Sequence, residues 1–180
     1  MASQPLTSKT KAGPAPPYSD IDTPTRLANL GKRDLVFLLE TANRSLSIRT
    51  EQEFRELVLG LQQILPMEGV ISVMSRLTPG SDPEKAAHIV NLGYSDEWLK
   101  LYFDNQYAAI DPIVRNHIGR FKPQIWSQTF KKATTPDEKA FVAQAREFNL
   151  DEGLTLGHAC RRTSIASLLS FQGRQIASHP

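Results

Sequence analysis

Cysteine is nearly absent from this sequence, whose 180 residues include only Cys160. A single cysteine excludes a disulfide within the chain, and this favours a reducing compartment. No apolar run approaches the roughly 20 residues that a transmembrane helix requires. The N-terminal residues also lack the apolar segment of a secretory signal. We therefore expect a cytoplasmic protein that makes no membrane contact.

An excess of charge of one sign is also missing. The chain has 21 basic and 19 acidic residues, which gives a formal net charge of +2. This balance provides no electrostatic footprint for nucleic acid. With 40% hydrophobic residues, the chain can form one globular domain with a substantial core. Residues 1–30 are rich in proline and poor in hydrophobic periodicity, and we expect a disordered tail there, followed by one domain over residues 31–180.

Recognisable catalytic and cofactor motifs are absent as well. The sequence has no phosphate-binding loop, no dinucleotide-binding glycine motif and no nucleophile elbow. Its four histidines are scattered without metal-ligand spacing, so no metal site is expected. Cys160 and His158 could form a catalytic pair, but they lack a third, orienting residue. A free thiol in a hairpin is the simpler interpretation, and we expect no catalytic residues, no cofactor and no enzymatic activity.

Hydrophobic periodicity predicts an alternation of helices and strands. Helices are expected from residue 32, from the capping box of Thr50 and Glu53, from Ser95, from Asp111 and from a second capping box at Thr135 and Glu138. The second helix should bury one apolar stripe, made of Phe54, Leu57, Val58, Leu61 and Leu65. Strands are expected at residues 69–74, 88–94, 124–126, 153–159 and 165–171, with a loop at 78–83 and a turn at 160–163. This order favours an α+β fold with an antiparallel sheet and helices packed on its faces.

Aromatic residues are concentrated between positions 94 and 126. Both tryptophans and three of the four tyrosines of the chain lie there. Ligand pockets are mostly apolar and aromatic, with a few polar groups that orient the ligand. Indole, phenol and carboxylate groups together could bind a small amphiphile with carbonyl and amide groups. By spacing alone, however, an aromatic stripe on a helix is more often plain core.

The segment from Trp98 to Val114, WLKLYFDNQYAAIDPIV, closely resembles the autoinducer-binding motif of LuxR-type quorum-sensing regulators. That motif has a Trp, a Tyr four residues later, and an Asp-Pro followed by two hydrophobic residues. The family also has a Trp fifteen residues after the Asp, matched here by Trp126. A Gly that opens a strand matches Gly153, and a later strand with a serine matches Ser167 to Ser170. The resemblance covers about residues 35–171.

The resemblance implies a role for each matching residue. Trp98 would donate its indole N–H to the carbonyl of an N-acyl-homoserine lactone, and Asp111 would accept the ligand amide N–H. Tyr102 and Ser170 would bond the acyl carbonyl. Trp126 would pack against the lactone ring. Further residues would line the pocket, namely Tyr94, Tyr107, Ile113 and Val114.

The resemblance also implies a fold and partners. It implies an α/β/α sandwich with a central antiparallel sheet of about five strands and helices on both faces. Members of the family act as dimers, so a homodimer or a heterodimer with a full-length relative is expected. The family continues with a helix-turn-helix domain, through which alone it contacts DNA. The residues after Ser170 are too few for that domain, and we expect an excised or naturally truncated sensor.

Other functions remain open at this point. The pocket could accept another small amphiphile, the chain could modify such a ligand as an enzyme, or it could inhibit a full-length regulator by pairing with it. The acyl chain length of the ligand depends on how far side chains such as Val73, Met74 and Tyr107 enter the pocket. Periodicity does not give that depth.

Overall fold

The computed structural model describes residues 30–76, 88–117, 122–160 and 162–176. The expected loop at 78–83 and nearly all of the expected tail lie outside these residues, and the turn at 160–163 is described only in part. The helices are α2 (Lys32–Ser45), α3 (Glu51–Gly60), α4 (Asp96–Asp104), α5 (Pro112–His117), α6 (Trp126–Phe130) and α7 (Pro136–Glu147), with short 3-10 turns at Leu61–Gln63 and Tyr107–Ala109. The strands are β1 (Gly69–Arg76), β2 (His88–Leu92), β3 (Gln124–Ile125), β4 (Gly153–Cys160) and β5 (Ile165–Gln172).

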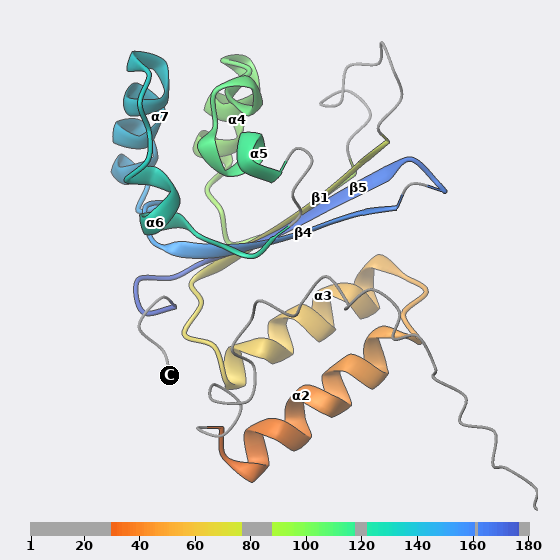
Figure 1. Cartoon of the computed structure of the whole chain (residues 1–180). Coiled ribbons are helices and arrows are strands. Elements are labelled where there is room, and N and C mark those ends of the chain that lie inside the picture. Colours follow the sequence, from red (N-terminus) through yellow and green to blue (C-terminus); the bar gives the residue numbers. More distant parts are fainter. Residues whose placement is uncertain (1–29, 77–87, 118–121, 161, 177–180) are drawn as a thin grey trace, which may run out of the picture.

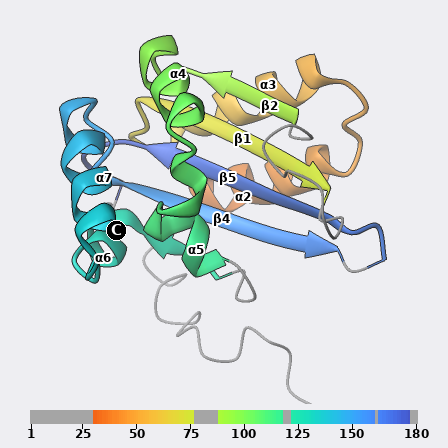
Figure 2. The ribbon, with the colours of Figure 1, turned by 90° about the horizontal axis from the view of Figure 1, so that it is seen from above.

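The five strands form one sheet in the order β2-β1-β5-β4-β3, and each neighbouring pair is antiparallel. Helices α2 and α3 cover one face of this sheet, and helices α4 to α7 cover the other (Figure 1). Seen from above, the segment from α4 to α5 crosses the strands, and α6 and α7 lie near one end of them (Figure 2). The expected α/β/α sandwich with a five-stranded antiparallel sheet is therefore confirmed.

The helix starts follow the capping chemistry of the sequence. Thr50 and Thr135 each accept a hydrogen bond from the backbone N–H of the glutamate three residues later, and that glutamate reaches back to the capping residue's own N–H. Ser95 accepts from the backbone N–H of Trp98 at the start of α4. These caps satisfy amide groups that have no partner inside the helix.

The two faces of the sheet have separate cores. Below the sheet, Val58 of α3 packs with Met67, Val70 and Phe171. Above it, a larger cluster contains both tryptophans and is built mainly from α4 to α7. Because side chains alternate along a strand, Val70 and Phe171 point to the α3 side while Ile71 and Ser170 point to the other.

The helices on the lower face are less buried than expected. Of the stripe predicted for α3, only Val58 is fully buried. Helix α2 has no buried residue, and Leu39 within the helix and Leu46 at its C-cap are 71% and 77% exposed. Within the described residues, none of the helices is both long and apolar enough to cross a membrane.

Candidate ligand-binding site

A cavity of about 420 Å³ lies between the sheet and the helices α4 to α7. Its floor comes from β1, β4 and β5, and its walls come from α4, α5, α6 and α7. Most of its lining is apolar, and few polar side chains face it. The polar and aromatic part of the lining includes Tyr94, Trp98, Tyr102, Asp111, Trp126, Thr155 and Ser170. An apolar cavity with a few convergent polar groups is the usual form of a small-molecule site.

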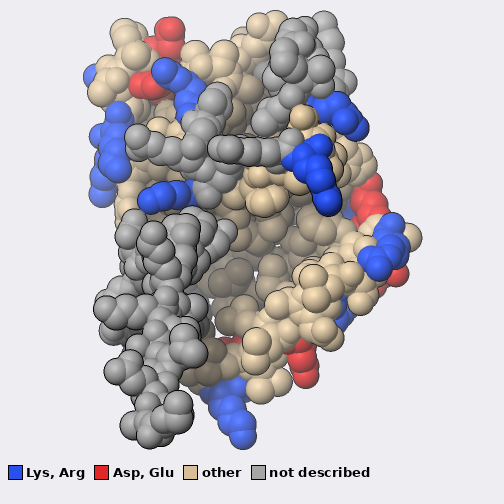
Figure 3. Space-filling model, turned by 45° about the vertical axis from the view of Figure 1, so that its right-hand side comes forward, with Lys and Arg blue, Asp and Glu red and all other residues tan. Residues whose placement is uncertain are grey.

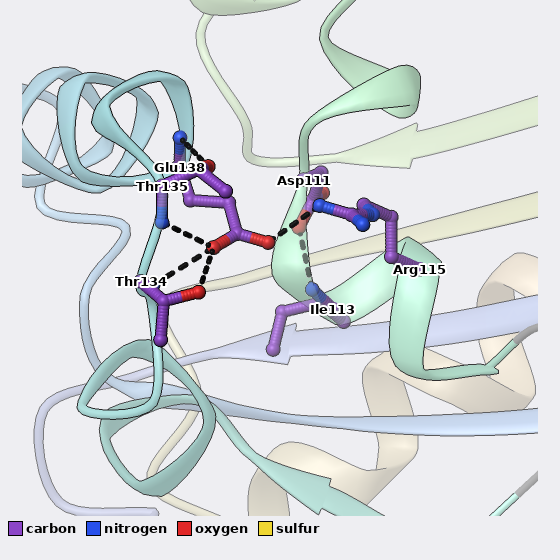
Figure 4. Close-up of polar contacts among 6 residues, drawn as sticks. All are labelled: Asp111, Ile113, Arg115, Thr134, Thr135 and Glu138. Carbon is purple, nitrogen blue, oxygen red and sulfur yellow. Dashed lines mark hydrogen bonds and ion pairs between the residues drawn. The ribbon is translucent and has the colours of Figure 1, made fainter.

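Asp111 is the acidic residue of this lining and lies at the start of α5. Its Oδ1 accepts a hydrogen bond of 2.7 Å from the backbone N–H of Ile113 (Figure 4). Its Oδ2 accepts one of 3.0 Å from the Tyr102 hydroxyl. Burial raises the pKa of Asp111 to about 6, although these hydrogen bonds favour the charged form. The carboxylate is therefore held in a fixed orientation, and burial still penalises its charge.

Tyr94 carries a buried hydroxyl with no hydrogen-bond partner among the described residues. The side chain is buried beside the cavity, and its pKa is raised by burial and by the nearby charge of Asp111. Leaving a buried hydroxyl unsatisfied costs free energy. Tyr94 therefore offers an unused hydrogen-bonding group at the wall of the cavity.

Trp126 is oriented by a chain of hydrogen bonds across two strands. Its indole N–H donates to Oγ1 of Thr155 at 2.8 Å, and this oxygen also lies 2.8 Å from Oγ of Ser170. Thr155 is completely buried. Gly153 lets the ring approach the sheet, since a Cβ there would lie 2.7 Å from the Trp126 ring and 2.4 Å from the Phe171 carbonyl oxygen. Because the Trp126 N–H is already bonded, this residue presents a ring face rather than a donor.

Trp98 lies at the centre of an aromatic cluster on the helical wall. Its ring centroid is 5.9 Å from those of Tyr102 and Phe141 and 5.2 Å from that of Phe148. Such tilted and edge-on contacts are the favoured geometries for aromatic pairs. The cluster fixes the orientation of the indole at the cavity.

The structure brings eight of the nine residues expected from the sequence to the cavity: Tyr94, Trp98, Tyr102, Asp111, Ile113, Val114, Trp126 and Ser170. Tyr107 is placed differently. It packs behind the wall against Trp98, Tyr102 and Phe141, and its hydroxyl donates to Gln144 of α7. In this structure Tyr107 supports the lining residues and is not one of them.

Other residues of the lining were not predicted from the sequence, above all Thr155, Phe141 and His117. Thr155 could have been recognised as a polar residue within a mostly apolar strand, and the structure places it opposite Ser170. Phe141 resembled ordinary core of α7. His117 is buried at the end of α5, where its ring nitrogens lie near the Ile113 carbonyl and the Gln124 amide, and burial lowers its pKa.

Two walls of the cavity are also linked at the surface. Arg115 of α5 contacts Glu138 at the start of α7 with an N–O distance of 2.5 Å (Figure 4). The same carboxylate accepts hydrogen bonds from the backbone N–H groups of Thr134 and Thr135, which hold its pKa below its usual range. Glu138 thus caps α7 and ties it to α5.

In the face drawn in Figure 3, basic and acidic residues lie interspersed around the margin, and the centre of that face is uncharged. Within the part of the chain that the structure describes, no cluster of His, Cys, Asp and Glu could hold a metal ion.

Comparison with known proteins agrees with this geometry. The family model of the autoinducer-binding domain matches residues 50–180. The transcriptional activator TraR of Agrobacterium vitis is 34% identical over 71 residues, which are 38% of this chain and 30% of TraR. The activator AnoR of Acinetobacter nosocomialis is 29% identical over 108 residues, which are 60% of this chain and 43% of AnoR. The matched segments thus span less than half of these relatives.

Solved structures show the same fold at low sequence identity. The N-acylhomoserine-lactone-dependent LuxR-family factor CepR2 of Burkholderia cenocepacia has a TM-score of 0.59 and 20% identity, covering 78% of this chain and 79% of CepR2. SdiA, whose source is Escherichia coli, was solved with octanoyl-rac-glycerol; it has a TM-score of 0.59 and 18% identity, covering 81% of this chain and 56% of SdiA. These structures support the fold, and the family model covers most of the chain. The chain therefore belongs to the autoinducer-binding domain family of LuxR-type quorum-sensing regulators.

Proposed function

We propose that this domain binds an N-acyl-homoserine lactone in the cavity between the sheet and α4 to α7. The observation that carries the proposal is the buried carboxylate of Asp111, held by Tyr102 and Ile113 at an otherwise mostly apolar cavity. A carboxylate that is only 8% exposed is largely shielded from solvent, so it gains much from an additional hydrogen-bond donor. The amide N–H of an acyl-homoserine lactone supplies that donor.

The other polar groups suit the remaining parts of the ligand. The Trp98 indole N–H would donate to the lactone carbonyl, and the Trp126 ring face would pack against the lactone. Tyr102 already donates to Asp111, whereas the Tyr94 hydroxyl has no partner among the described residues. We therefore assign the acyl carbonyl to Tyr94, with Ser170 as a second donor, and give Tyr102 the role of orienting Asp111.

A second candidate ligand is a monoacylglycerol, and the fold match to SdiA in complex with octanoyl-rac-glycerol favours it. Such a ligand has an ester in place of an amide and carries free hydroxyl groups. A hydroxyl could donate to Asp111 as an amide N–H does. The same cavity could therefore accept either head group.

Calorimetry with N-octanoyl-homoserine lactone and with 1-octanoylglycerol separates the two candidates. The proposal expects saturable binding of the lactone that is tighter than binding of the glycerol ester. Tighter binding of the ester would favour the second candidate, and binding of neither would contradict both. Recovery of intact lactone after incubation with the protein is also expected, since we propose a sensor that leaves its ligand unchanged.

The relatives TraR and AnoR are transcriptional activators. We propose that ligand binding in this domain is likewise the input to transcriptional regulation, exerted within a dimer. Sedimentation of the protein with and without bound lactone measures whether the ligand promotes that dimer. A protein that is monomeric in both states would contradict this part of the proposal.

A further inference from the structure

The floor of the cavity is a strip formed by the central strands β1 and β5. Three successive rows of paired residues face the cavity, and all six residues line it. The rows are Ile71 with Ser170, Val73 with Leu168, and Ser75 with Ala166. The strip begins beside the polar group of Ser170 and Thr155 and continues away from it with apolar and then small side chains.

The length of this strip gives the length of a ligand chain that could lie on it. Ser170 and Ala166 are four residues apart on β5, and a strand rises about 3.3 Å per residue, so the strip is roughly 13 Å long. In an all-trans hydrocarbon, each single bond of about 1.52 Å, at bond angles of about 111°, advances the chain by about 1.25 Å. A linear hydrocarbon chain therefore covers the strip of roughly 13 Å with about ten bonds.

The far row differs from the other two in side-chain size. Ser75 and Ala166 leave space above the sheet that larger side chains would fill. The β1–β5 ladder ends one row further on, at Arg76 and Ile165, and Arg76 is exposed. Within the described residues, the floor of the cavity therefore stops one row beyond Ser75 and Ala166.

We infer that the site takes a long acyl chain, of about ten to twelve carbons, laid along β1 and β5, and that beyond the Ser75–Ala166 row a longer chain gains no further contact with these strands. The inference rests on the proposed function for the head group and adds the chain class of the ligand. A ligand with a short chain leaves the far row uncovered and buries less apolar surface. Affinity therefore rises with chain length until the chain passes Ala166.

The test compares hexanoyl-, octanoyl- and dodecanoyl-homoserine lactone by calorimetry on three proteins. In the wild type, dodecanoyl lactone should bind at least tenfold more tightly than hexanoyl lactone. Ala166→Phe should weaken dodecanoyl binding at least tenfold and change hexanoyl binding less than threefold. Leu156→Phe adds a ring on β4 at the opposite face of the sheet, where Leu156 is exposed, and should change neither affinity.

Several results would overturn the inference. They are tighter binding of the hexanoyl lactone by the wild type, equal losses for both lactones in Ala166→Phe, or no loss for either. Retained hexanoyl binding shows that the variant is folded, and Ala166→Val provides a smaller change if the phenylalanine variant does not fold.

A comparison without the lactone ring separates this inference from the proposed function. Thermal shifts with hexanamide and dodecanamide report chain length without a lactone. If no lactone binds but dodecanamide alone stabilises the wild type, and Ala166→Phe abolishes that shift, the head-group proposal fails and the chain-length inference stands. If lactones bind while the length of the chain has no effect, the inference fails and the proposed function stands.

Discussion

Asp111 combines two roles at one residue, since it begins α5 and also faces the cavity. As a helix cap it needs only an acceptor for the Ile113 N–H, and Asn would serve equally well. Its charge is explained by the cavity, because burying a charge costs free energy unless a nearby group pairs with it or donates hydrogen bonds to it. The charge of Asp111 is thus the feature that most directly indicates a ligand.

A first prediction concerns pH and the ligand-free protein. Burial raises the pKa of Asp111 to about 6 in the folded state, above its ordinary value of 3.8. Between these values the folded protein binds a proton that the unfolded chain does not, so this contribution to stability is present at low pH and is lost as the pH rises through about 6. The free energy of unfolding of Asp111→Asn should therefore improve relative to the wild type as the pH is raised from about 4 to about 7. Urea denaturation at several pH values measures this difference, and a constant difference would show that Asp111 keeps an ordinary pKa.

A second prediction concerns Thr155, which accepts the Trp126 indole N–H. Thr155→Val preserves shape but leaves this buried donor unsatisfied, at a cost of about 1–3 kcal/mol in the free energy of unfolding. Thr155→Ser keeps the hydroxyl and should cost clearly less. Equal losses in the two variants, measured by urea denaturation, would mean that the methyl group matters and the hydrogen bond does not.

A third prediction distinguishes the roles of Tyr94, which lies just before α4, and Tyr102, which lies within α4. Tyr94→Phe removes a hydroxyl that has no partner among the described residues, so the ligand-free protein should lose little stability. Lactone affinity should nevertheless fall about tenfold if Tyr94 bonds the acyl carbonyl. Tyr102→Phe removes a donor to Asp111 and should raise the pKa of that carboxyl further. Unchanged lactone affinity in Tyr94→Phe would show that a residue other than Tyr94 bonds the acyl carbonyl.

At the scale of elements, the two capping boxes provide a matched pair. Thr50 caps α3 below the sheet, and Thr135 caps α7, which forms a wall of the cavity. Replacing either by Ala should lower the free energy of unfolding by about 1 kcal/mol. Only Thr135→Ala should also weaken lactone binding, because it loosens the start of α7. A similar loss of affinity in Thr50→Ala would indicate a general effect of stability on binding.

Much of the element order could be predicted from the sequence because it depends on local chemistry. The caps at Thr50, Ser95 and Thr135 fix helix starts through bonds within four residues, and the sequence displays them directly. The short β-branched run at residues 69–74, bounded by turn residues, likewise predicts a strand. The short helix α6 was missed, since its five residues are too few to show a helical period.

Burial was harder to predict than element type because it depends on tertiary packing. The apolar pattern of α2 resembles that of a core helix, yet Leu39 and Leu46 are exposed. Tyr107 lies beside three aromatic rings and still packs behind the cavity wall, a placement that depends on how α4 meets α7. Thr155 joins the site only through pairing of β4 with β5.

For the whole molecule, the two faces of the sheet differ, because one is covered by a packed core and the other borders the cavity. The α3 face closes over a compact cluster of Val58, Met67, Val70 and Phe171. On the other face a cavity of about 420 Å³ lies between the sheet and the helices α4 to α7. A ligand that fills this cavity binds only the folded state, so it should stabilise the protein in proportion to its affinity.

The most direct test of this account is calorimetric binding of an N-acyl-homoserine lactone to the wild type and to Asp111→Asn at neutral pH. The Asn Oδ1 can accept the Ile113 N–H, and the Asn Nδ2 can donate to the Tyr102 hydroxyl oxygen. The variant should therefore fold and retain the cap. The lost hydrogen bond to a charged group contributes about 1.5–3 kcal/mol, which predicts a roughly ten- to hundredfold fall in affinity. An affinity equal to that of the wild type would reduce Asp111 to a helix cap and contradict the ligand site at its centre.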